Sequence, residues 1–473
     1  MTIPVTDELP ISLRAYAVRA DNRSGPSRSH KRSEIEASEW HLIFDCETRV
    51  DPAQSLRFGA YQIRQSGALM EQGLFYAPEN VTRAELAQIR SYADENHLEC
   101  LTQTEFVEAI LFTIGYDYRG TIVGFNLPFD ISRIAIKSSS ARGKMKGGFS
   151  FTLSEDKRRP NLQVKHISAK AAFIQFAAPM KSRTNRSRVK LGKREPIQRG
   201  HFIDCKTLAN ALLARSFSLA SLCEALGVEN SKIEYSDFEA PISDDFIGYA
   251  LRDVQATWEC YCELIERFDQ LALAGTSPEK IYSEASLGKA CLKAMGVKPW
   301  RECQPDFDPA IIGKVMSAYY GGRSEVHIRR EERQVMLCDF LSMYPTVCTL
   351  MGLWSFVTSE GVEVHDATEK AKAILLGDIL SELRCTQFWR GLTILVRVIP
   401  VGDIFPVRAK YADAQQATIG LNYLTNERGQ WFTLADCLAS TLLSGKPPNV
   451  IESLSSKVVG RYQLVALDAL VHR

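Results

Sequence analysis

The sequence has no long hydrophobic run. No stretch of about 18 apolar residues occurs among its 473 residues, and the chain does not start with a cationic segment followed by an apolar one. We therefore expect no membrane span and no secretory signal, and we predict a cytoplasmic protein without a membrane partner.

Paired cysteines and a strong charge of one sign are also missing. The 12 cysteines are scattered, and the closest pair, Cys260 and Cys262, lacks the CxxC spacing of many zinc and redox sites. Reduced thiols are the expectation, rather than disulfides. The net charge is only +1, with 24% charged residues, so any nucleic-acid-binding surface must come from a local basic patch.

The composition and hydrophobic patterning indicate two or three packed domains, because 45% of the residues are hydrophobic. Polar, Ser-rich residues 21–37 lead us to expect a flexible tail over 1–37. Apolar strands are predicted at 40–50, 58–67 and 67–77, a hairpin at 161–176, and helices at 83–97, 103–118 and 244–268. A boundary near 270–280 precedes further helical sequence. This mixture of strands and helices predicts α/β and α+β domains.

Five polar residues stand at positions where strands end or along one helix face. Asp45 and Glu47 are two apart at the end of a strand, so both point to one side. Asp130 follows another short buried strand, and Tyr249 lies four residues before Asp253 on a predicted helix. Each also has an ordinary interpretation. The first two fit the wet face of a strand, Asp130 fits a helix cap, and the last pair fits a core tyrosine beside a surface acid.

The order of these motifs is more specific than any one of them. D-x-E, then N-x-x-F-D, then Y-x-x-x-D resembles the DEDD superfamily of 3′-5′ exonucleases, and the tyrosine form is similar to the proofreading domain of family B DNA polymerases. The resemblance implies an RNase H-like domain, a mixed sheet flanked by helices. It implies that the metal ligands are Asp45, Glu47, Asp130 and Asp253. It also implies that Tyr249 helps position the attacking water. Asn126 and Phe129 would contact the DNA strand.

The residue types fit that chemistry. Two-metal hydrolysis of a phosphodiester needs two divalent cations about 4 Å apart, and hard oxygen ligands suit Mg²⁺ or Mn²⁺. Gathered carboxylates repel one another by several kcal/mol per close pair at an effective dielectric of about 20, so a cluster of them argues for cations. Whether the four acids converge in space is left to the structure.

A basic stretch lies between the second and third motifs. Residues 181–199, KSRTNRSRVKLGKREPIQR, carry one acid, and the shorter ARGKMKGG at 141–148 is a second basic segment. A solvated hairpin or flexible loop explains such runs equally well. In an exonuclease they would follow phosphates without reading sequence. The DNA-binding candidates there are Arg188, Lys190, Lys193 and Arg194.

A second set of motifs follows near residue 320. Tyr320, Gly321, Gly322 and Arg323 resemble the Tyr-x-Gly-Gly segment of family B polymerases, although a Gly pair is most often a tight turn. DFLSMYPT, from Asp339 to Thr346, follows a short apolar run, VMLC, which we expect to be a buried strand. The motif resembles polymerase motif A.

The likeness to motif A gives roles to three residues of DFLSMYPT. It implies that Asp339 binds metal, that Ser342 and the backbone meet the triphosphate, and that Tyr344 gates the sugar. A buried strand leading into a helix, with a structural acid, is the other interpretation.

The rest of a polymerase site is not found in the sequence. After residue 350 no D-x-D pair and no K-x-x-x-N-S-x-Y-G pattern occurs, although nucleotidyl transfer requires two cations to be held. We therefore expect a partial palm, ending after motif A, at 309–473, joined by a helical connector at 276–308 to an exonuclease domain at 38–275.

The expected function is metal-dependent 3′-5′ exonuclease activity on DNA, either a single-stranded 3′ end or a primer-template, with an incomplete polymerase site. Two alternatives stay open: one subunit of a split or frameshifted polymerase completed by a second polypeptide, and a non-catalytic DNA-binding remnant. The short region before the first strand favours the compact, protein-primed branch of family B, and with it a bacterial, phage or mobile-element origin.

Overall fold

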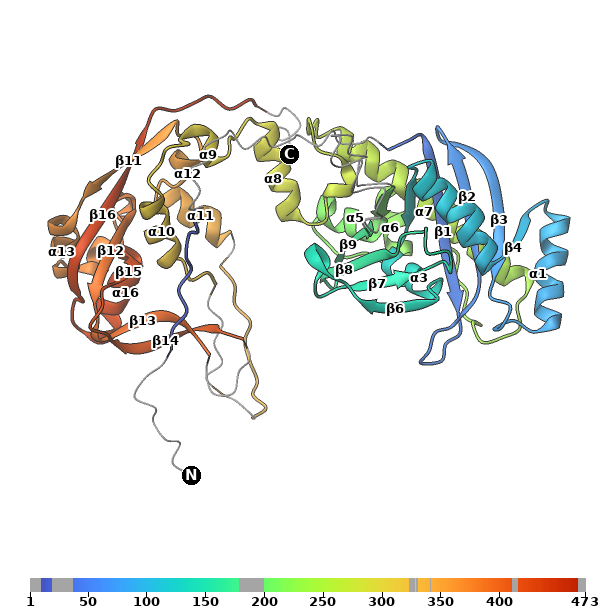
Figure 1. The fold of residues 1–473 in the computed structure, drawn as a ribbon, viewed down its shortest axis with the longest axis horizontal. Helices are drawn as coiled ribbons and strands as arrows, with labels where there is room; N and C mark the ends of the chain where they lie inside the picture. The colour runs from blue at the N-terminus through green and yellow to red at the C-terminus, as the bar shows by residue number, and fades with distance from the viewer. Residues whose placement is uncertain are drawn as a thin grey trace. The chain divides into compact units, whose positions relative to one another are not determined.

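The computed structural model describes residues 10–18, 37–177, 200–322, 328, 331–340, 342–410 and 416–466. These residues form two compact units that divide between Met295 and Gly296, and residues 10–18 belong to the second, smaller unit (Figure 1). The division falls within the segment 276–308 that the sequence assigns to a connector. Among the described residues, no helix is long and apolar enough to cross a membrane.

The larger unit is built on a mixed six-stranded sheet flanked by helices, which is the layered arrangement expected from the sequence (Figure 1). Strand β1 runs antiparallel to β2 and parallel to β5, so the sheet contains both kinds of pairing. In spatial order the strands are β10 (His201–Asp204), β5 (Thr121–Gly124), β1 (Trp40–Thr48), β2 (Leu56–Gln65), β3 (Ala68–Tyr76) and β4 (Glu99–Thr102).

The helices of this unit follow the predicted periodicity closely. The predicted helices at 83–97 and 244–268 are confirmed, and most of the one at 103–118 is a π-helix. The described helical segments are α1 (Arg83–Glu95), α2 (Gln103–Glu105), η1 (Phe106–Asp117), α3 (Leu127–Arg133), η2 (Gly143–Met145), α5 (Cys205–Leu213), α6 (Leu219–Leu226), α7 (Asp244–Asp269), η3 (Pro278–Lys280) and α8 (Glu284–Ala294).

Strand β1 separates two apolar cores by the alternation of its side chains. Leu42, Phe44 and Cys46 belong to the core that also holds residues of η1 and α3. Ile43 belongs to the other core, which holds residues of α1, α5, α6 and α7. Because side chains alternate along a strand, Asp45 and Glu47 emerge on the side of Ile43 and therefore towards α7.

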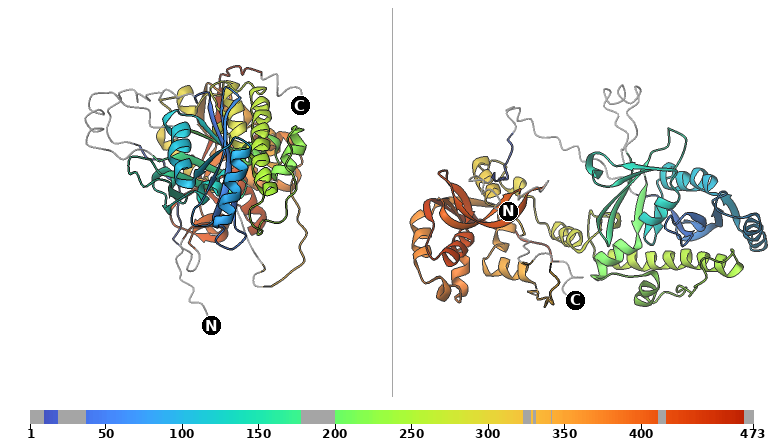
Figure 2. Two further views of the ribbon diagram at one scale, coloured as in Figure 1. Left: turned by 90° about the vertical axis from the view of Figure 1, so that its right-hand side faces the viewer. Right: turned by 90° about the horizontal axis from the view of Figure 1, so that it is seen from below.

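Helix α7 provides the opposing surface. Its start is fixed by Ser243, whose side chain accepts a hydrogen bond from the backbone of Phe246. Tyr249, Asp253 and Thr257, spaced four residues apart, are all buried on the side that packs against the sheet. Figure 2 shows this long yellow-green helix in its right-hand view.

A second, four-stranded antiparallel sheet covers part of the first core. Its order is β6-β7-β8-β9, and β8 pairs with β9 as the hairpin predicted at 161–176, which is thereby confirmed. The strands are β6 (Lys137–Ser140), β7 (Phe149–Thr152), β8 (Leu162–Ser168) and β9 (Ala171–Phe176). Leu162, Val164 and Phe176 turn inward to this core.

The smaller unit combines short helices with a four-stranded and a two-stranded sheet. Its strands are β11 (Gly361–Asp366), β12 (Ile394–Ile399), β13 (Val401–Ala409), β14 (Thr418–Thr425), β15 (Gln430–Thr433) and β16 (Asn449–Val459). Its helices are α9 (Trp300–Cys303), α10 (Pro309–Ser317), α11 (Met343–Leu350), α12 (Trp354–Val357), α13 (Thr368–Leu376), α14 (Ile379–Glu382), α15 (Thr386–Arg390) and α16 (Leu434–Ser444). Phe405 and Phe432 stack at 4.0 Å in its core.

Part of the expected tail makes defined contacts with this smaller unit. Ile11 forms a β-bridge with Ala409, and the backbone N–H of Ser12 donates to the carbonyl of Arg408 at 2.7 Å. The guanidinium of Arg14 lies 4.2 Å from the ring centre of Tyr319. Residues 10–18 of the segment expected to be a flexible tail over 1–37 therefore pack on the smaller unit.

The apolar run before Asp339 differs most from expectation. The sequence predicted a buried strand, but residues 331–340 have no regular secondary structure and are exposed. Val335, Met336 and Leu337 are 83%, 89% and 96% exposed. The prediction of a buried strand is wrong because an apolar run becomes a strand only when a neighbouring strand pairs with it, and no described strand does so here.

Candidate functional site: a carboxylate cluster beside a lysine

Three of the four predicted acids converge in the larger unit. Carboxylate oxygens of Asp45 and Glu47, from the end of β1, and of Asp253, from α7, all lie within 4.8 Å of one another. Glu47 and Asp253 are 7% and 3% exposed. The alternation of β1 and the packing of α7 thus bring together residues that are more than 200 positions apart.

Asp130 reaches the same region from another direction. It lies on α3, which packs in the core on the far side of β1, and its Oδ1 accepts a hydrogen bond from the backbone N–H of Cys46 at 3.3 Å. Asp130 is only 2% exposed, and its Oδ2 is buried without a hydrogen-bond partner in the described chain. The structure therefore places Asp130 beside the strand that carries the other acids, but outside their closest group.

Burial makes this set of acids electrostatically unfavourable. Burial, and then the charge of Asp253, raises the pKa of Asp45 to about 7. Burial and the charges of Asp45 and Asp253 raise the pKa of Glu47 well above its usual value, and burial with the charge of Asp45 does the same for Asp130. All three groups thus hold their negative charge at a cost that a nearby cation would relieve.

Lys232 supplies one positive charge, and sequence reasoning missed it. Its Nζ donates hydrogen bonds to Asp253 Oδ2 and to the Tyr249 hydroxyl, although burial opposes its charge. The charge of Asp253 and these hydrogen bonds outweigh burial and raise the pKa of Lys232, so the ammonium stays charged. Lys232 lies in an irregular segment between α6 and α7, where a single sequence gives no spacing signal for a site.

A cleft of about 690 Å³ opens over these groups. The predicted DNA-contacting residues Asn126 and Phe129 line it together with Asp45, Glu47, Tyr249, Asp253 and Lys232. Lys232 is the cation that contacts Asp253, while Arg49 and Lys206 also line the cleft. Its oxygen-only donor set, with Asp253 Oδ1 and Asp130 Oδ2 both buried and unpartnered in the described chain, fits divalent cations such as Mg²⁺ or Mn²⁺.

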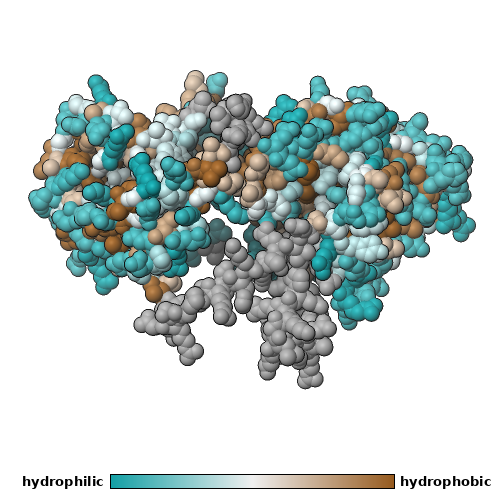
Figure 3. Space-filling model, turned by 90° about the horizontal axis from the view of Figure 1, so that it is seen from above, coloured by the Kyte–Doolittle hydropathy of each residue, from teal (hydrophilic) through white to brown (hydrophobic). Residues whose placement is uncertain are grey.

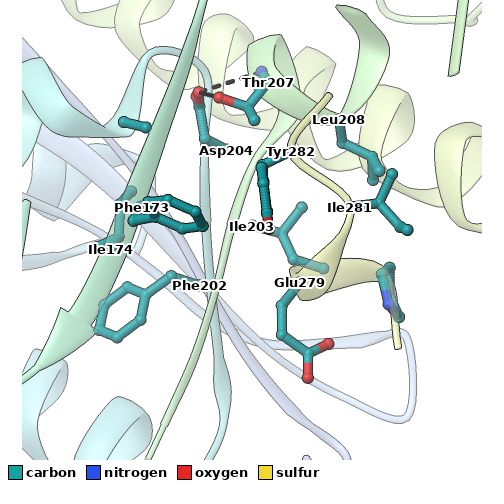
Figure 4. Close-up of a pocket in the computed structure, with 12 residues that line it drawn as sticks. Phe173, Ile174, Phe202, Ile203, Asp204, Thr207, Leu208, Glu279, Ile281 and Tyr282 are labelled. Carbon is teal, nitrogen blue, oxygen red and sulfur yellow. Dashed lines mark hydrogen bonds between the residues drawn. The ribbon is translucent and has the colours of Figure 1, made fainter. Parts of the chain in front are cut away.

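Asp204 is a second residue that sequence reasoning missed. It ends β10, and its Oδ1 accepts hydrogen bonds from the backbone N–H groups of Asn126 and Leu127 at 2.7 and 3.1 Å. Its Oδ2 accepts from the backbone and hydroxyl of Thr207, which Figure 4 shows at the edge of a small cavity of about 50 Å³. Asn126 has a left-handed backbone with φ of +67°, so Asp204 holds a strained turn at the start of α3. An acid closing an apolar strand, HFID, was a visible signal of the same kind as Asp45.

Other residues that the sequence predicts to bind DNA lie outside the described residues or in the smaller unit. Arg188, Lys190, Lys193, Arg194 and Arg323 lie outside the described residues. In the smaller unit, the ring of Tyr320 is 7% exposed and stacks on Phe432, so the side chain is a core residue instead of a surface contact, while Gly321 has the positive φ of a turn, +86°.

The described residues of DFLSMYPT are exposed. Asp339 and Ser342 are solvent-exposed, and Tyr344 is 73% exposed. In the described part of the chain, the only group of three or more acids, histidines or cysteines able to share a metal is that of Asp45, Glu47 and Asp253. The metal and nucleotide roles of Asp339, Ser342 and Tyr344 stay predictions from sequence.

Comparison with known proteins finds a similar solved structure but no matching sequence. No protein-family model matches the chain, and no curated protein matches it in sequence. Among solved structures, it is similar to phi29 DNA polymerase complexed with single-stranded DNA, with a TM-score of 0.33 and 10% identity over 90% of this chain. The chain spans 61% of the length of that polymerase chain.

Proposed function

We propose that this chain is a metal-dependent 3′-5′ exonuclease acting on DNA, with the larger unit as an RNase H-like exonuclease domain. The observation that carries the proposal is the convergence of Asp45, Glu47 and Asp253 within 4.8 Å, in the cleft lined by Asn126 and Phe129. The sequence order of these residues resembles that of the DEDD exonucleases, and their meeting in space is the condition which that resemblance requires.

Each group has a task that its surroundings support. Asp45, Glu47, Asp253 and Asp130 would hold the cations, and divalent cations supply the activated water and charge neutralisation needed for phosphodiester hydrolysis. Lys232 keeps the Tyr249 hydroxyl and Asp253 in one fixed arrangement. Asn126 and Phe129 would bind the 3′ end of the strand, and Asp204 fixes the turn that presents them.

The smaller unit adds a proposal about what the chain lacks. We infer a partial palm carrying motif A, in which Asp339 has no partner carboxylate among the described residues. Primer extension by the chain alone is expected to be undetectable. Clear incorporation of deoxynucleotides into a primer-template would overturn this part without affecting the exonuclease.

The experiment uses a 5′-labelled single-stranded oligonucleotide with Mg²⁺ or Mn²⁺. The wild-type chain should shorten it stepwise from the 3′ end, and the double variant Asp45→Ala, Glu47→Ala should not. Asp339→Ala is the matched control, because it removes an acid of the smaller unit and should leave degradation unchanged. Equal behaviour of wild type and the double variant would refute the exonuclease and favour a non-catalytic DNA-binding protein.

A further inference from the structure

The second sheet of the larger unit concentrates positive charge that the proposed active site does not use. Residues 137–177 contain nine lysines and arginines against two acids, in a chain whose net charge is +1. Arg159 bonds to Asp117 and Arg158 to Asp156, in both cases through short ion pairs. The other cations, which have no ion pair within the described chain, are Lys137, Arg142, Lys144, Lys146, Lys157, Lys165 and Lys170.

Five of these cations gather at one end of the sheet. Arg142, Lys144 and Lys146 lie in the turn between β6 and β7, and Lys165 and Lys170 lie in the β8–β9 hairpin. The register brings the two turns together, because Phe149, which starts β7, pairs with Val164 of β8.

A close backbone contact strengthens this placement. A Cβ added to Gly148 would lie 2.4 Å from the carbonyl oxygen of Val164 and 2.8 Å from Cβ of Lys165. The basic turn is therefore held directly against the β8 hairpin. We call the surface formed by residues 141–149 and 165–170 the basic tip.

The basic tip also exposes an aromatic ring. Phe149 is 52% exposed, although it lies in a strand, and its ring stacks on the buried Phe151 at 6.0 Å. Beside the tip, the outer face of the sheet carries amides, with Gln175 donating to Gln163 at 3.0 Å, and also Phe173, which is 36% exposed. Unpaired cations and an exposed, stacked aromatic ring at the same end of a sheet are the elements that single-stranded nucleic acid contacts, through its phosphates and by base stacking.

We propose that the basic tip is a second DNA-contacting surface, which binds the strand upstream of the 3′ end held in the carboxylate cleft. This inference rests on the proposed function for the identity of its ligand. Strand β6, which leads into the tip, starts four residues after α3, the helix that carries Asp130, so a short segment of one unit joins the tip to the site.

An anionic lipid surface is the competing partner for a basic tip with an exposed aromatic residue. The tip belongs to the same unit as the carboxylate cleft, which favours DNA, while Ile167, 45% exposed, is an apolar side chain that a bilayer would also bury. Binding to vesicles of phosphatidylcholine and phosphatidylserine is therefore included as an arm of the test.

The test measures binding of a fluorescent 20-nucleotide single strand to the full chain in EDTA, so that no cleavage occurs. The triple variant Arg142→Ala, Lys144→Ala, Lys146→Ala should reduce the slope of log affinity against log salt by about 2, because each phosphate contact on a single strand contributes about 0.7. Phe149→Ala should weaken binding about tenfold with the slope unchanged. The matched control Lys370→Ala, Arg384→Ala, Arg390→Ala removes three exposed cations of the smaller unit and should change neither quantity.

The outcomes separate this inference from the proposed function. An unchanged slope in the triple variant overturns the inference, whether or not the chain degrades DNA, and so does loss of vesicle binding with DNA binding intact. A reduced slope without degradation supports the tip and refutes the exonuclease alone. If the triple variant folds poorly by circular dichroism, Lys165→Ala with Lys170→Ala tests the tip from its other hairpin and should lower the slope by about 1.

Discussion

The acids of the sequence motifs have opposite surroundings in the two units. Asp45, Glu47 and Asp253 of the larger unit are enclosed between a central strand and a 26-residue helix, and share one lysine. Asp339 of the smaller unit stands in an exposed segment without regular structure. A short sequence motif therefore identifies a kind of residue, whereas a site exists only where the fold brings a second and a third group to it. The comparison supports the proposal that the chemistry belongs to the larger unit, and five experiments can break or sharpen it.

The largest contrast is expected between Asp45→Asn and Asp339→Asn. The first removes a charge from the buried cluster and should reduce exonuclease turnover about a thousandfold, since metal-assisted charge stabilisation contributes several kcal/mol. The second should leave turnover within twofold of wild type. Single-turnover degradation of a labelled strand measures both, and similar losses in the two variants would erase the distinction between the units.

Lys232→Met should have the next largest effect, about a hundredfold on turnover, because it releases both Tyr249 and Asp253. Lys232→Arg keeps the charge and should recover part of the activity. Lys289→Met, which removes an exposed lysine of the same unit, is the matched control and should behave as wild type. A Lys232 variant with full activity would show that the carboxylates need no fixed cation beside them.

Asp204→Ala should lower turnover about ten- to a hundredfold by freeing the left-handed turn at Asn126. KM for a long strand should rise as well, since Asn126 and Phe129 lose their fixed place in the cleft. Thr207→Val removes a partner of the opposite carboxylate oxygen only and should affect turnover less than threefold. A purely structural role would lower the melting temperature of Asp204→Ala without moving KM.

Metal binding provides a readout that does not require DNA. At a Mn²⁺ concentration a hundred times the Kd, the free energy of unfolding should rise by about 2.7 kcal/mol, a shift of very roughly 5–10 °C in Tm for the larger unit. Asp45→Ala with Glu47→Ala should abolish the shift, and Asp339→Ala should retain it. Differential scanning fluorimetry is sufficient, and a shift that depends on Asp339 would move the metal to the smaller unit.

The smallest effect concerns the packing of β1 on α7. His41 bonds to the Tyr261 hydroxyl at 3.1 Å, and burial lowers its pKa. A lowered folded-state pKa means that the unfolded chain takes up the proton first, so stability is present above about pH 6.5 and is lost as the pH falls below it. His41→Phe should reduce the decrease in the free energy of unfolding between pH 7.5 and pH 5.5 by up to about 1 kcal/mol, as measured by urea unfolding. An identical pH dependence in both proteins would show that His41 is not responsible.

Local pattern was enough to predict much of the larger unit. The strand at 40–50, the helix at 244–268 and the hairpin at 161–176 follow from alternation and helical spacing, and three of the four acids predicted to gather do meet. Lys232 could not be predicted, because its position depends on how an irregular segment crosses α7. The buried strand before Asp339 was wrongly predicted for a related reason, since the burial of an apolar run depends on partners elsewhere in the chain.

The alternation of β1 has a consequence for how tolerant this protein is of sequence change. The side chains of Asp45 and Glu47 point to the same face of β1 as that of Ile43. Those of Leu42, Phe44 and Cys46 point to the opposite face. Inserting or deleting one residue between Leu42 and Phe44 would move every later side chain of the strand to the opposite face. Both acids would then point into the apolar core, and Phe44 would point into the cleft. The register shift between β1 and β2 lies after Glu47, so it does not change the direction of either acid. We therefore expect insertions and deletions in this strand to abolish activity even where conservative substitutions at the same positions are tolerated. The number of residues in β1 matters here as much as their chemistry.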